Sequence, residues 1–261
     1  MPDWIKFLGT AGARFVVYKQ LRASGGIWCH VQGKNIIIDP GPGTLYRCYA
    51  AKPRLNPEQL DAVIITHRHL DHSTEANVII EAMTRGTFNR RGVLFAPADA
   101  IFDEEPVVFG FLRDSVDKLE ILQEGGCYRL GDIEFCTPVQ HRHPVETYGL
   151  LFNLPYGRIG FIVDTAFFPQ LVESYQGTDL LILNLMLLDP PPAARIQHLD
   201  LIGAGRLIEG IKPQVTIITH FGMTLLKHKP YLIAKRLQEE TGFKVIAARD
   251  GLTLDVESLF A

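Results

Sequence analysis

Residues 63–74, VIITHRHLDHST, decide the fold and point to the chemistry of the chain. The stretch begins with an apolar, β-branched run that is too short for a helix, and such a run predicts a strand buried on both faces. The strand ends in four side chains of metal-binding type, which are His67, His69, Asp71 and His72. Residues two apart in extended chain point the same way, so His67 and His69 can face one metal ion. Asp71 and His72 are adjacent and point differently, which suits a second ion nearby.

The alternative is that these histidines are ordinary core residues. A single histidine at the edge of an apolar strand is usually a hydrogen-bonded part of the core. That explanation does not extend to the whole cluster, because burying three imidazoles and a carboxylate together without a metal leaves costly polar groups. Imidazole and carboxylate ligands suit Zn²⁺, Fe or Mn rather than Ca²⁺ or Cu(I).

Other residues of metal-binding type also follow buried strands. Asp164 ends the apolar run GFIVD, and His220 ends the apolar run TIITH. His141, His143 and His198 each come shortly after a predicted strand or at the start of a predicted helix. Ligand-type side chains at the ends of several strands predict a site at one edge of a sheet scaffold.

The composition is that of an ordinary globular domain. Of the 261 residues, 47% are hydrophobic and 21% are charged, and the formal net charge is −3. We therefore expect a single domain over residues 1–261. A slightly acidic chain creates no global field that attracts nucleic acid, so we expect no extended nucleic-acid-binding surface.

The sequence indicates neither a membrane protein nor a secreted one. No apolar run approaches the ~20 residues needed to span a bilayer, and the N-terminus lacks a basic segment followed by a long apolar one. We expect a cytoplasmic protein without membrane partners. The cysteines form no C-x-x-C pair, so we predict that they are reduced and mostly buried: Cys29, Cys48, Cys127 and Cys136.

Strands come first in the chain, and strands then alternate with helices. The predicted strands cover residues 4–10, 14–20, 25–31, 35–43, 62–66, 93–97, 133–139, 148–154, 158–164, 179–185 and 215–220. The predicted helices cover residues 56–60, 73–84 with Ser73 as the cap, 167–175, 199–210 and 223–240. This order fits two sheets packed together with helices on their outer faces. Residues 98–124 give no clear pattern.

The chain resembles the metallo-β-lactamase superfamily of dinuclear metallohydrolases. His67, His69, Asp71 and His72 match its H-x-H-x-D-H signature, and the resemblance extends from FLGT near the start to AARDGLTLDV near the end. It implies an αββα sandwich of four layers, in the α/β (α+β) class. It also implies two divalent metal ions, with Zn²⁺ expected and Mn²⁺ or Fe as alternatives. The implied ligands are His67, His69 and His143 for one ion, Asp71, His72 and His220 for the other, and Asp164 as a bridge.

Three further residues have roles that the sequence leaves partly open. His141 competes with His143 as the ligand, and we prefer His143 because HPVETYG resembles the corresponding segment of the ribonuclease Z branch; His141 then supports the site from behind. His198 lies 220 − 198 = 22 residues before His220, where relatives of ribonuclease Z carry a histidine that helps catalysis. Its alternative role is hydrogen bonding at a helix end. Asp39, in a tight turn, is expected to shape the loop beside the metals.

The resemblance favours the branch that contains ribonuclease Z and the phosphoribosyl cyclic phosphodiesterases. We expect a hydrolase of small or cyclic phosphodiesters or of RNA ends, in which hydroxide from a two-metal site attacks phosphorus and Asp71 and His198 act in catalysis. The alternatives are a lactone, thioester or other acyl-ester hydrolase, and a metal-bound protein that binds a ligand without turnover. We expect a small-molecule or nucleotide-type substrate and, as the commonest assembly, a possible homodimer.

The sequence also allows predictions about two arginines near the candidate ligands and about two loops near the substrate. Arg68 and Arg142 each lie between two candidate ligands, where strand alternation points them away from the metals, so we expect ion pairs rather than phosphate contacts. The loops that choose the substrate are expected around residues 98–124 and 190–197.

Overall fold

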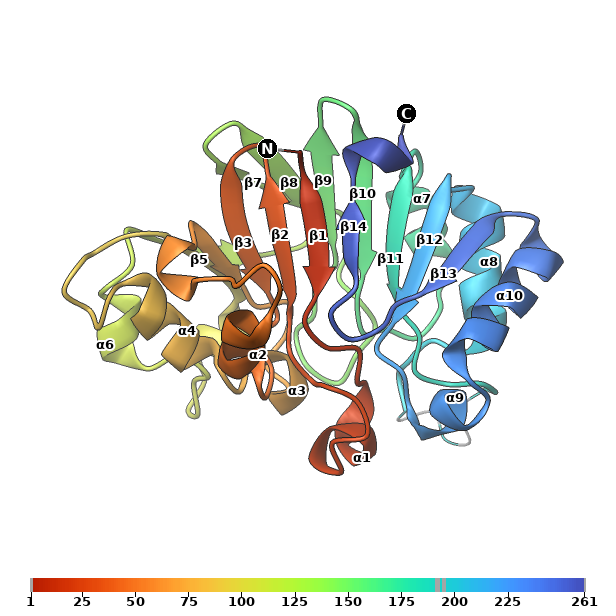
Figure 1. Ribbon diagram of the computed structural model, residues 1–261, viewed down its shortest axis with the longest axis horizontal. Coiled ribbons are helices and arrows are strands. Elements are labelled where there is room, and N and C mark those ends of the chain that lie inside the picture. Colours follow the sequence, from red (N-terminus) through yellow and green to blue (C-terminus); the bar gives the residue numbers. More distant parts are fainter. Residues whose placement is uncertain (1, 191–192, 194–195, 261) are drawn as a thin grey trace.

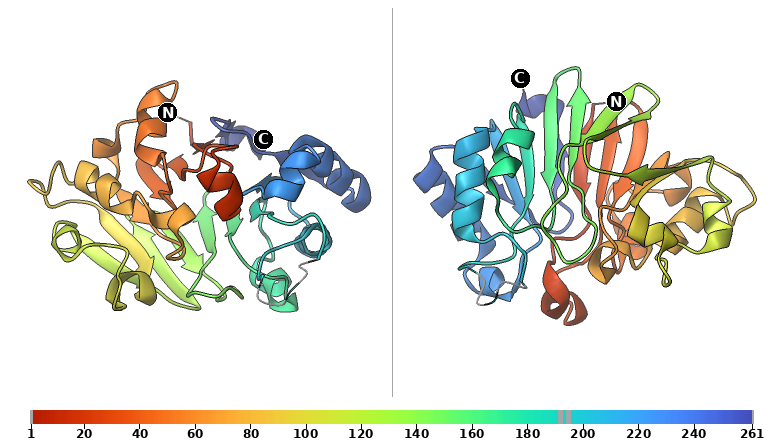
Figure 2. Two further views of the ribbon diagram at one scale, coloured as in Figure 1. Left: turned by 90° about the horizontal axis from the view of Figure 1, so that it is seen from below. Right: turned by 180° about the vertical axis from the view of Figure 1, so that it is seen from behind.

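Two β-sheets lie face to face at the centre of the molecule, and helices cover the outer face of each (Figure 1). The structure is a computed structural model that describes residues 2–190, 193 and 196–260. Seen from below and from behind, the same four layers follow one another across the molecule (Figure 2). The predicted αββα sandwich is therefore confirmed. Part of the predicted substrate loop at 190–197 lies outside the described residues.

The first sheet combines strands from the two ends of the chain. Its order within the described residues is β14-β1-β2-β3-β4-β5-β6, and β3 to β6 run parallel to one another. Its strands are β1 (Trp4–Phe7), β2 (Ile27–Val31), β3 (Lys34–Ile38), β4 (Ala62–Ile64), β5 (Val93–Pro97), β6 (Lys118–Leu122) and β14 (Thr253–Asp255).

The second sheet pairs antiparallel hairpins with a parallel section. Its order is β13-β12-β11-β10-β9-β8-β7, and β10 to β13 are parallel. Its strands are β7 (Gly126–Leu130), β8 (Ile133–Thr137), β9 (Leu150–Leu154), β10 (Gly157–Ile162), β11 (Leu180–Asn184), β12 (Val215–Thr219) and β13 (Lys244–Ala247). Because parallel strands end at a common edge, the loops after β3, β4, β10, β11 and β12 can meet there.

Helices pack on the two outer faces. On the first sheet lie α2 (Thr44–Ala50), the 3₁₀ turn η1 (Pro57–Gln59), α3 (Leu70–Ser73), α4 (Ala76–Met83), α5 (Ala98–Phe102) and α6 (Gly110–Arg113). On the second lie α7 (Pro169–Ser174), α8 (Leu201–Ile211), α9 (Met223–Lys227) and α10 (Pro230–Thr241). The short helix α1 (Ala13–Tyr18) instead projects from the lower edge of the sandwich in Figure 1, and the turn η2 (Glu257–Leu259) follows β14.

Three apolar clusters hold the layers together. The central cluster fills the space between the sheets and contains Phe7, Phe95, Phe135 and Phe161. The other two lie between each sheet and its helices. Burying one large apolar side chain stabilises the fold by about 1.5–3 kcal/mol, so the strands are fixed well enough to position loops at their ends.

Several elements differ from the sequence prediction. Residues 14–20 were expected as a strand because of their β-branched pair, but Ala13–Tyr18 forms α1 in a loop whose two ends are fixed by tertiary contacts. Ser73 ends α3 instead of capping a long helix, and its hydroxyl donates to the carbonyls of Arg68 and His69. Pro230 begins α10, which divides the predicted helix 223–240. The strands β6, β7, β13 and β14 were not predicted.

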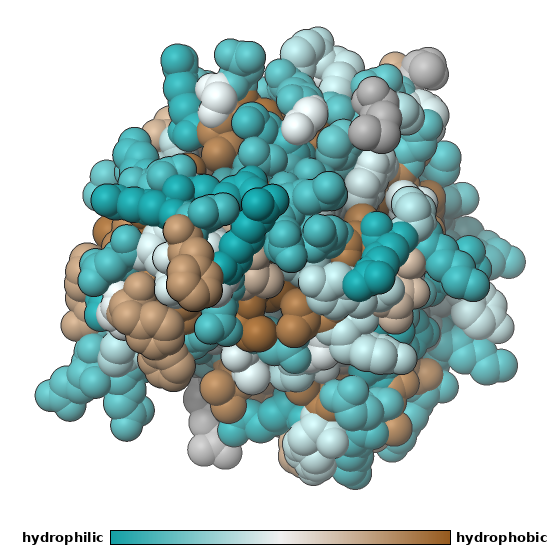
Figure 3. Space-filling model, turned by 60° about the vertical axis from the view of Figure 1, so that its left-hand side comes forward, coloured by the Kyte–Doolittle hydropathy of each residue, from teal (hydrophilic) through white to brown (hydrophobic). Residues whose placement is uncertain are grey.

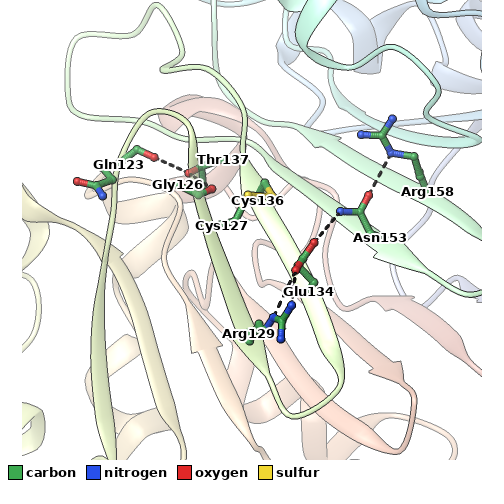
Figure 4. The surroundings of a disulfide bond; sticks show 9 residues. All are labelled: Gln123, Gly126, Cys127, Arg129, Glu134, Cys136, Thr137, Asn153 and Arg158. Carbon is green, nitrogen blue, oxygen red and sulfur yellow. Dashed lines mark hydrogen bonds and ion pairs between the residues drawn. A yellow bond between two sulfur atoms is a disulfide. The ribbon is translucent and has the colours of Figure 1, made fainter.

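The cysteine prediction was wrong for one pair. Cys127 and Cys136 lie directly opposite each other in the β7–β8 hairpin and form a disulfide bond (Figure 4). Strand register brings them together, and a separation of nine residues gives no sequence signal for it. On the same surface, the Glu134 carboxylate accepts hydrogen bonds from Arg129 and Asn153. Cys29 and Cys48 are free and buried, as expected.

Large apolar side chains are exposed at several places on the surface. Within the part of the chain that the structure describes, no helix is long and apolar enough to cross a membrane. Figure 3 shows one end of the molecule as mostly hydrophilic, with apolar atoms gathered near its middle. Several aromatic side chains on helices and turns are more than half exposed: Phe15, Tyr18, Phe88 and Tyr231.

Candidate metal centre

The candidate ligands meet where the parallel strands of both sheets end. His67 follows β4 in the first sheet, whereas Asp164 and His220 follow β10 and β12 in the second. Four groups of side chains have ligand atoms within 4.8 Å of one another: His67, His69, His143 and Asp164; Asp71, His72 and His220; Asp164, His198 and His220; and Asp39, His67 and His72. All seven side chains implied as ligands by the sequence therefore lie at one site.

The loop at residues 66–73 turns sharply after β4 and carries four of these side chains. His69 lies just before α3, and the single turn of α3 contains Asp71 and His72. Gly41 lies against this turn, because an added Cβ there would collide with the carbonyl oxygen of Asp71. The sequence HRHLDHS thus becomes a compact corner, in which successive side chains point to two sides of the centre.

Asp39 organises the 66–73 loop through three hydrogen bonds. Its carboxylate accepts from the backbone N–H and the hydroxyl of Thr66, both at 2.7 Å, and lies 2.8 Å from Nδ1 of His72. Because the Thr66 hydroxyl donates to Asp39, its oxygen can accept from Nδ1 of His67, 3.1 Å away. Nδ1 of both histidines is then protonated, which leaves Nε2 of each as the free ligand atom. The predicted shaping role of Asp39 thus takes the form of orienting two histidines.

Hydrogen bonding at Nδ1 also orients His143, which lies in the loop before β9 of the second sheet. Its Nδ1 lies 3.0 Å from the carbonyl oxygen of Gln197, and its Nε2 lies 3.0 Å from Nδ1 of His69. The backbone of the preceding Arg142 bonds to Thr165 and Ala166, which ties this loop to the one that carries Asp164. The structure therefore aims His143 into the centre.

His141 lies behind the centre. It is buried, its Nε2 is 3.4 Å from the hydroxyl of Tyr175, and it belongs to none of the ligand groups. Burial lowers the pKa of His141 to about 3, so its ring is neutral. This placement is consistent with a supporting position and leaves the ligand position to His143.

Asp164 faces side chains from the ligand sets implied for both ions. Its Oδ2 is 3.7 Å from Nε2 of His67 and 3.5 Å from Nε2 of His72, and its Oδ1 is 3.5 Å from Nε2 of His220. Asn184, at the end of β11, donates from Nδ2 to Oδ1 at 3.0 Å. Sequence reasoning missed Asn184, although it ends the apolar run LLILN just as Asp164 and His220 end theirs.

His198 and His220 close the centre. Nδ1 of His198 is 3.5 Å from Oδ2 of Asp164, and the His198 ring lies 5.0 Å from that of His143. His220 has a left-handed backbone, φ 61°, and its Nε2 is 3.4 Å from Asp71 and 3.1 Å from Nε2 of His72. This left-handed backbone sets the direction in which the His220 side chain points toward Asp71 and His72.

Burial and charge act against each other on the ionisable groups. Burial lowers the pKa values of His67, His69 and His143, which keeps these rings in the neutral form that binds metals. Burial alone would raise the pKa of Asp164, but the neighbouring histidines, His220 first, outweigh it and hold the pKa well below its usual range. These three rings thus present neutral nitrogens around an ionised carboxylate, whereas Asp71, Asp164 and Asp39 raise the pKa of His72 against the effect of its burial.

The residues present fit divalent metal ions. Nε2 of His67 is buried and has no hydrogen-bond partner among the described residues, although it points at Asp164 between other imidazoles. A buried nitrogen without a partner is costly in free energy unless a cation binds it. The nitrogen and carboxylate donors are those that Zn²⁺, Fe and Mn accept. A cavity of about 50 Å³ lies between the sheets beside Asp71, His72 and His220.

Comparison with known proteins identifies the family. The model of the beta-lactamase superfamily domain matches residues 34–221. The chain belongs to the β-lactamase superfamily. Uncharacterized protein MJ1374 of Methanocaldococcus jannaschii is 33% identical over 261 residues, which cover 97% of this chain and 94% of that protein. The superfamily's metal-dependent fold implies divalent metals, in agreement with the histidine and aspartate cluster.

Two solved structures share the superfamily fold over nearly the whole chain. The metallo-beta-lactamase fold protein YhfI from Bacillus subtilis has a TM-score of 0.78 at 17% identity and covers 97% of this chain and 99% of its own. A diphosphatase from the PhnP family has a TM-score of 0.69 at 20% identity and covers 97% of each chain. At these identities the likeness shows the fold alone.

The two arginines of the motif loops are occupied elsewhere. Arg68 forms an ion pair with Asp103 and donates to the carbonyl of Glu105 at 2.8 Å, as the sequence predicted. Arg142 instead lies over the ring of Phe168, with the guanidinium 4.6 Å from the ring centre. Arg68 is therefore engaged with the segment after α5, and Arg142 packs on an aromatic ring rather than forming the expected ion pair.

Proposed function

We propose that this protein is a dinuclear metal-dependent phosphodiesterase that acts on a small or cyclic phosphodiester or on an RNA end. The observation that carries the proposal is the place of His198, whose Nδ1 lies 3.5 Å from Asp164 while its side chain stays 18% exposed. A histidine that both touches the candidate bridging carboxylate and reaches solvent can meet a substrate. The fold shared with a PhnP-family diphosphatase supports phosphoryl chemistry.

Two ions would occupy the two ligand groups. His67, His69 and His143 would hold one, Asp71, His72 and His220 the other, and Asp164 would contact both. We expect Zn²⁺, with Mn²⁺ and Fe as alternatives. When bound, such a pair of cations supplies hydroxide near neutral pH and offsets the charge that develops on a phosphoryl group.

The chain's own residues contribute positioning and a proton. Asp39 and Thr66 fix the rings of His67 and His72, and Asn184 holds Oδ1 of Asp164, so the centre needs little rearrangement during the reaction. Because Nδ1 of His198 faces Asp164, Nε2 is the atom free to face the leaving oxygen, and it donates a proton there when the ring is protonated on both nitrogens. Such a donor typically contributes 10²–10⁴-fold to the rate.

The test is hydrolysis of bis(p-nitrophenyl) phosphate by metal-loaded protein. We expect turnover by the wild type, no turnover by Asp71→Ala, and a kcat lowered about 10²–10⁴-fold in His198→Ala with its metal content unchanged. His228→Ala is the matched control, because His228 is exposed and its Nδ1 lies 2.9 Å from the carbonyl oxygen of Thr224 in α9, away from the candidate ligands. It should keep wild-type kinetics.

Two results would contradict the proposal. If the wild type binds two metal equivalents but cleaves no phosphodiester, and hydrolyses a lactone or thioester instead, the acyl-hydrolase alternative takes its place. If His198→Ala turns over at the wild-type rate, His198 has only a structural role and the observation that carries the proposal is lost.

A further inference from the structure

The loop that carries α1 leaves the first sheet after β1 and returns at β2, and hydrogen bonds fix its base. The backbone N–H groups of Thr10 and Ala11 both donate to the carbonyl of Ala23, at 2.9 and 3.0 Å. Asp250 accepts from the Thr10 hydroxyl at 2.7 Å and from the Ala23 backbone N–H at 2.8 Å. Residues 12–22, called the α1 loop below, therefore project from a rigid anchor.

The anchor lies directly against the candidate metal centre. The backbone N–H of Gly12 donates to the carbonyl of Phe221 at 3.1 Å, and a Cβ added to Gly12 would collide with the carbonyl oxygen of His220. The helix α1 also packs beside α3, which carries Asp71 and His72. Seen from below, α1 lies between the two halves of the sandwich (Figure 2, left). The α1 loop thus borders the candidate metal centre.

The outer face of α1 presents two aromatic rings to solvent. Phe15 and Tyr18 are 55% and 62% exposed, and their ring centres are 5.7 Å apart. Residues three apart lie on one face of a helix, so the two rings, tilted by 53° to each other, lie side by side on that face. Leu70, placed between His69 and Asp71, is 76% exposed. Exposed apolar side chains gathered beside a polar site mark a binding surface.

The packing of α1 does not require these rings. Val16 is completely buried and anchors the helix, whereas its neighbour Phe15 faces outward. Two exposed cations, Arg14 and Lys19, flank the ring pair. Aromatic rings next to positive charges match a ligand that combines a flat ring with phosphate groups. An acyl chain would gain from the rings but nothing from the cations.

We propose that the α1 loop is a nucleotide-binding element, in which Phe15 and Tyr18 stack on a base while Arg14 and Lys19 attract the phosphates of the same molecule. This rests on the proposed function in one respect, that the phosphodiester of the substrate lies at the candidate metal centre. It goes beyond it by assigning a nucleobase as the group that the protein recognises, and by naming the residues that contact it.

The test is equilibrium binding to metal-loaded protein, measured by isothermal titration calorimetry. The two probes are adenosine 5′-monophosphate and ribose 5-phosphate, in which a hydroxyl group takes the place of the base. We expect the wild type to bind the nucleotide about tenfold or more tightly than the sugar phosphate, because one stacked base contributes that much. The double variant Phe15→Ala/Tyr18→Ala should bind both probes with equal affinity.

Two control proteins separate stacking from other effects. Phe88→Ala/Tyr231→Ala removes two exposed aromatic rings on other helices or turns and should keep the full preference for the nucleotide. Phe15→Tyr/Tyr18→Phe exchanges the two rings and should also keep it. The proposal is supported if Phe15→Ala/Tyr18→Ala loses the preference for the nucleotide while both control proteins keep it.

The proposal is overturned if the wild type does not prefer the nucleotide, or if Phe15→Ala/Tyr18→Ala still prefers it. It is also overturned if that variant loses binding of octanoate and retains binding of the nucleotide, because the rings then serve an acyl group. Equilibrium binding needs no turnover. Failure to hydrolyse bis(p-nitrophenyl) phosphate would therefore count against the proposed function, whereas equal binding of the two probes counts against the role of the α1 loop.

Discussion

The 66–73 loop and the α1 loop lie next to each other at the same edge of the sandwich, yet they are built in opposite ways. In the 66–73 loop, His67 is fully buried and its neighbours are held by Asp39. In the α1 loop, hydrogen bonds fix only the base, and the helix shows Phe15 and Tyr18 to solvent. The difference separates two tasks, because holding metal ions needs a fixed constellation whereas contacting a substrate needs an accessible surface.

The largest effect should come from removing a ligand of the 66–73 loop. His69→Ala should lose about one metal equivalent and lower turnover by more than about 100-fold, the upper limit for residues that only support a ligand. Thr74→Val, which changes an exposed side chain at the end of α3, is the control and should keep both. Plasma emission spectroscopy measures the metal content, and release of p-nitrophenolate from bis(p-nitrophenyl) phosphate measures turnover. Full metal content in His69→Ala would remove His69 from the ligand set.

Removing the metals should affect the two loops unequally. A ligand present at 100 times its Kd stabilises the native state by about 2.7 kcal/mol, so a chelator should lower the Tm by roughly 5–10 °C. Without metals, the imidazoles of the 66–73 loop are left facing one another, and amide hydrogen exchange should become faster there. Exchange in residues 12–22 should stay the same. Equal acceleration in both loops would show that they form one cooperative unit.

Loss of Asp39 should weaken metal binding without removing a ligand. Asp39→Ala frees the rings of His67 and His72, and metal affinity should fall about 10–100-fold in a chelator competition assay. Asp61→Ala is a matched control, because its carboxylate also accepts a backbone N–H, from Asn35 at 2.9 Å, but contacts no candidate ligand. Both variants should lose stability, and only Asp39→Ala should lose metal affinity. An equal loss of affinity in both would make the role of Asp39 purely structural.

The same two loops show what the sequence could and could not predict. The ligands of the 66–73 loop were readable because they are contiguous and follow a strand of strong apolar character. His143, Asp164 and His220 were readable because each follows a strand or a known segment. Their meeting point follows from a general rule, since parallel strands of both sheets end at one edge.

The helix in the α1 loop could not be predicted from the sequence, for a physical reason. Its β-branched residues favour a strand locally, but the contacts of Thr10, Ala23 and Asp250 leave it no neighbouring strand to pair with, and a short helix satisfies its backbone instead. The Cys127–Cys136 bond and the hydrogen bond from Asn184 to Asp164 depend on strand register, which no local pattern records. Tertiary contacts decided each of these features.

The smallest effects concern adjacent residues of the α1 loop. Phe15→Ala should change the free energy of unfolding by less than about 0.5 kcal/mol, because an exposed side chain loses little packing. Val16→Ala, one residue further on, should lower it by about 2 kcal/mol, because Val16 is fully buried. Urea denaturation of the metal-free protein measures both without interference from ligand binding. A large loss in Phe15→Ala would mean that its ring packs against the protein in solution, and the exposed surface on which nucleotide recognition depends would then be absent.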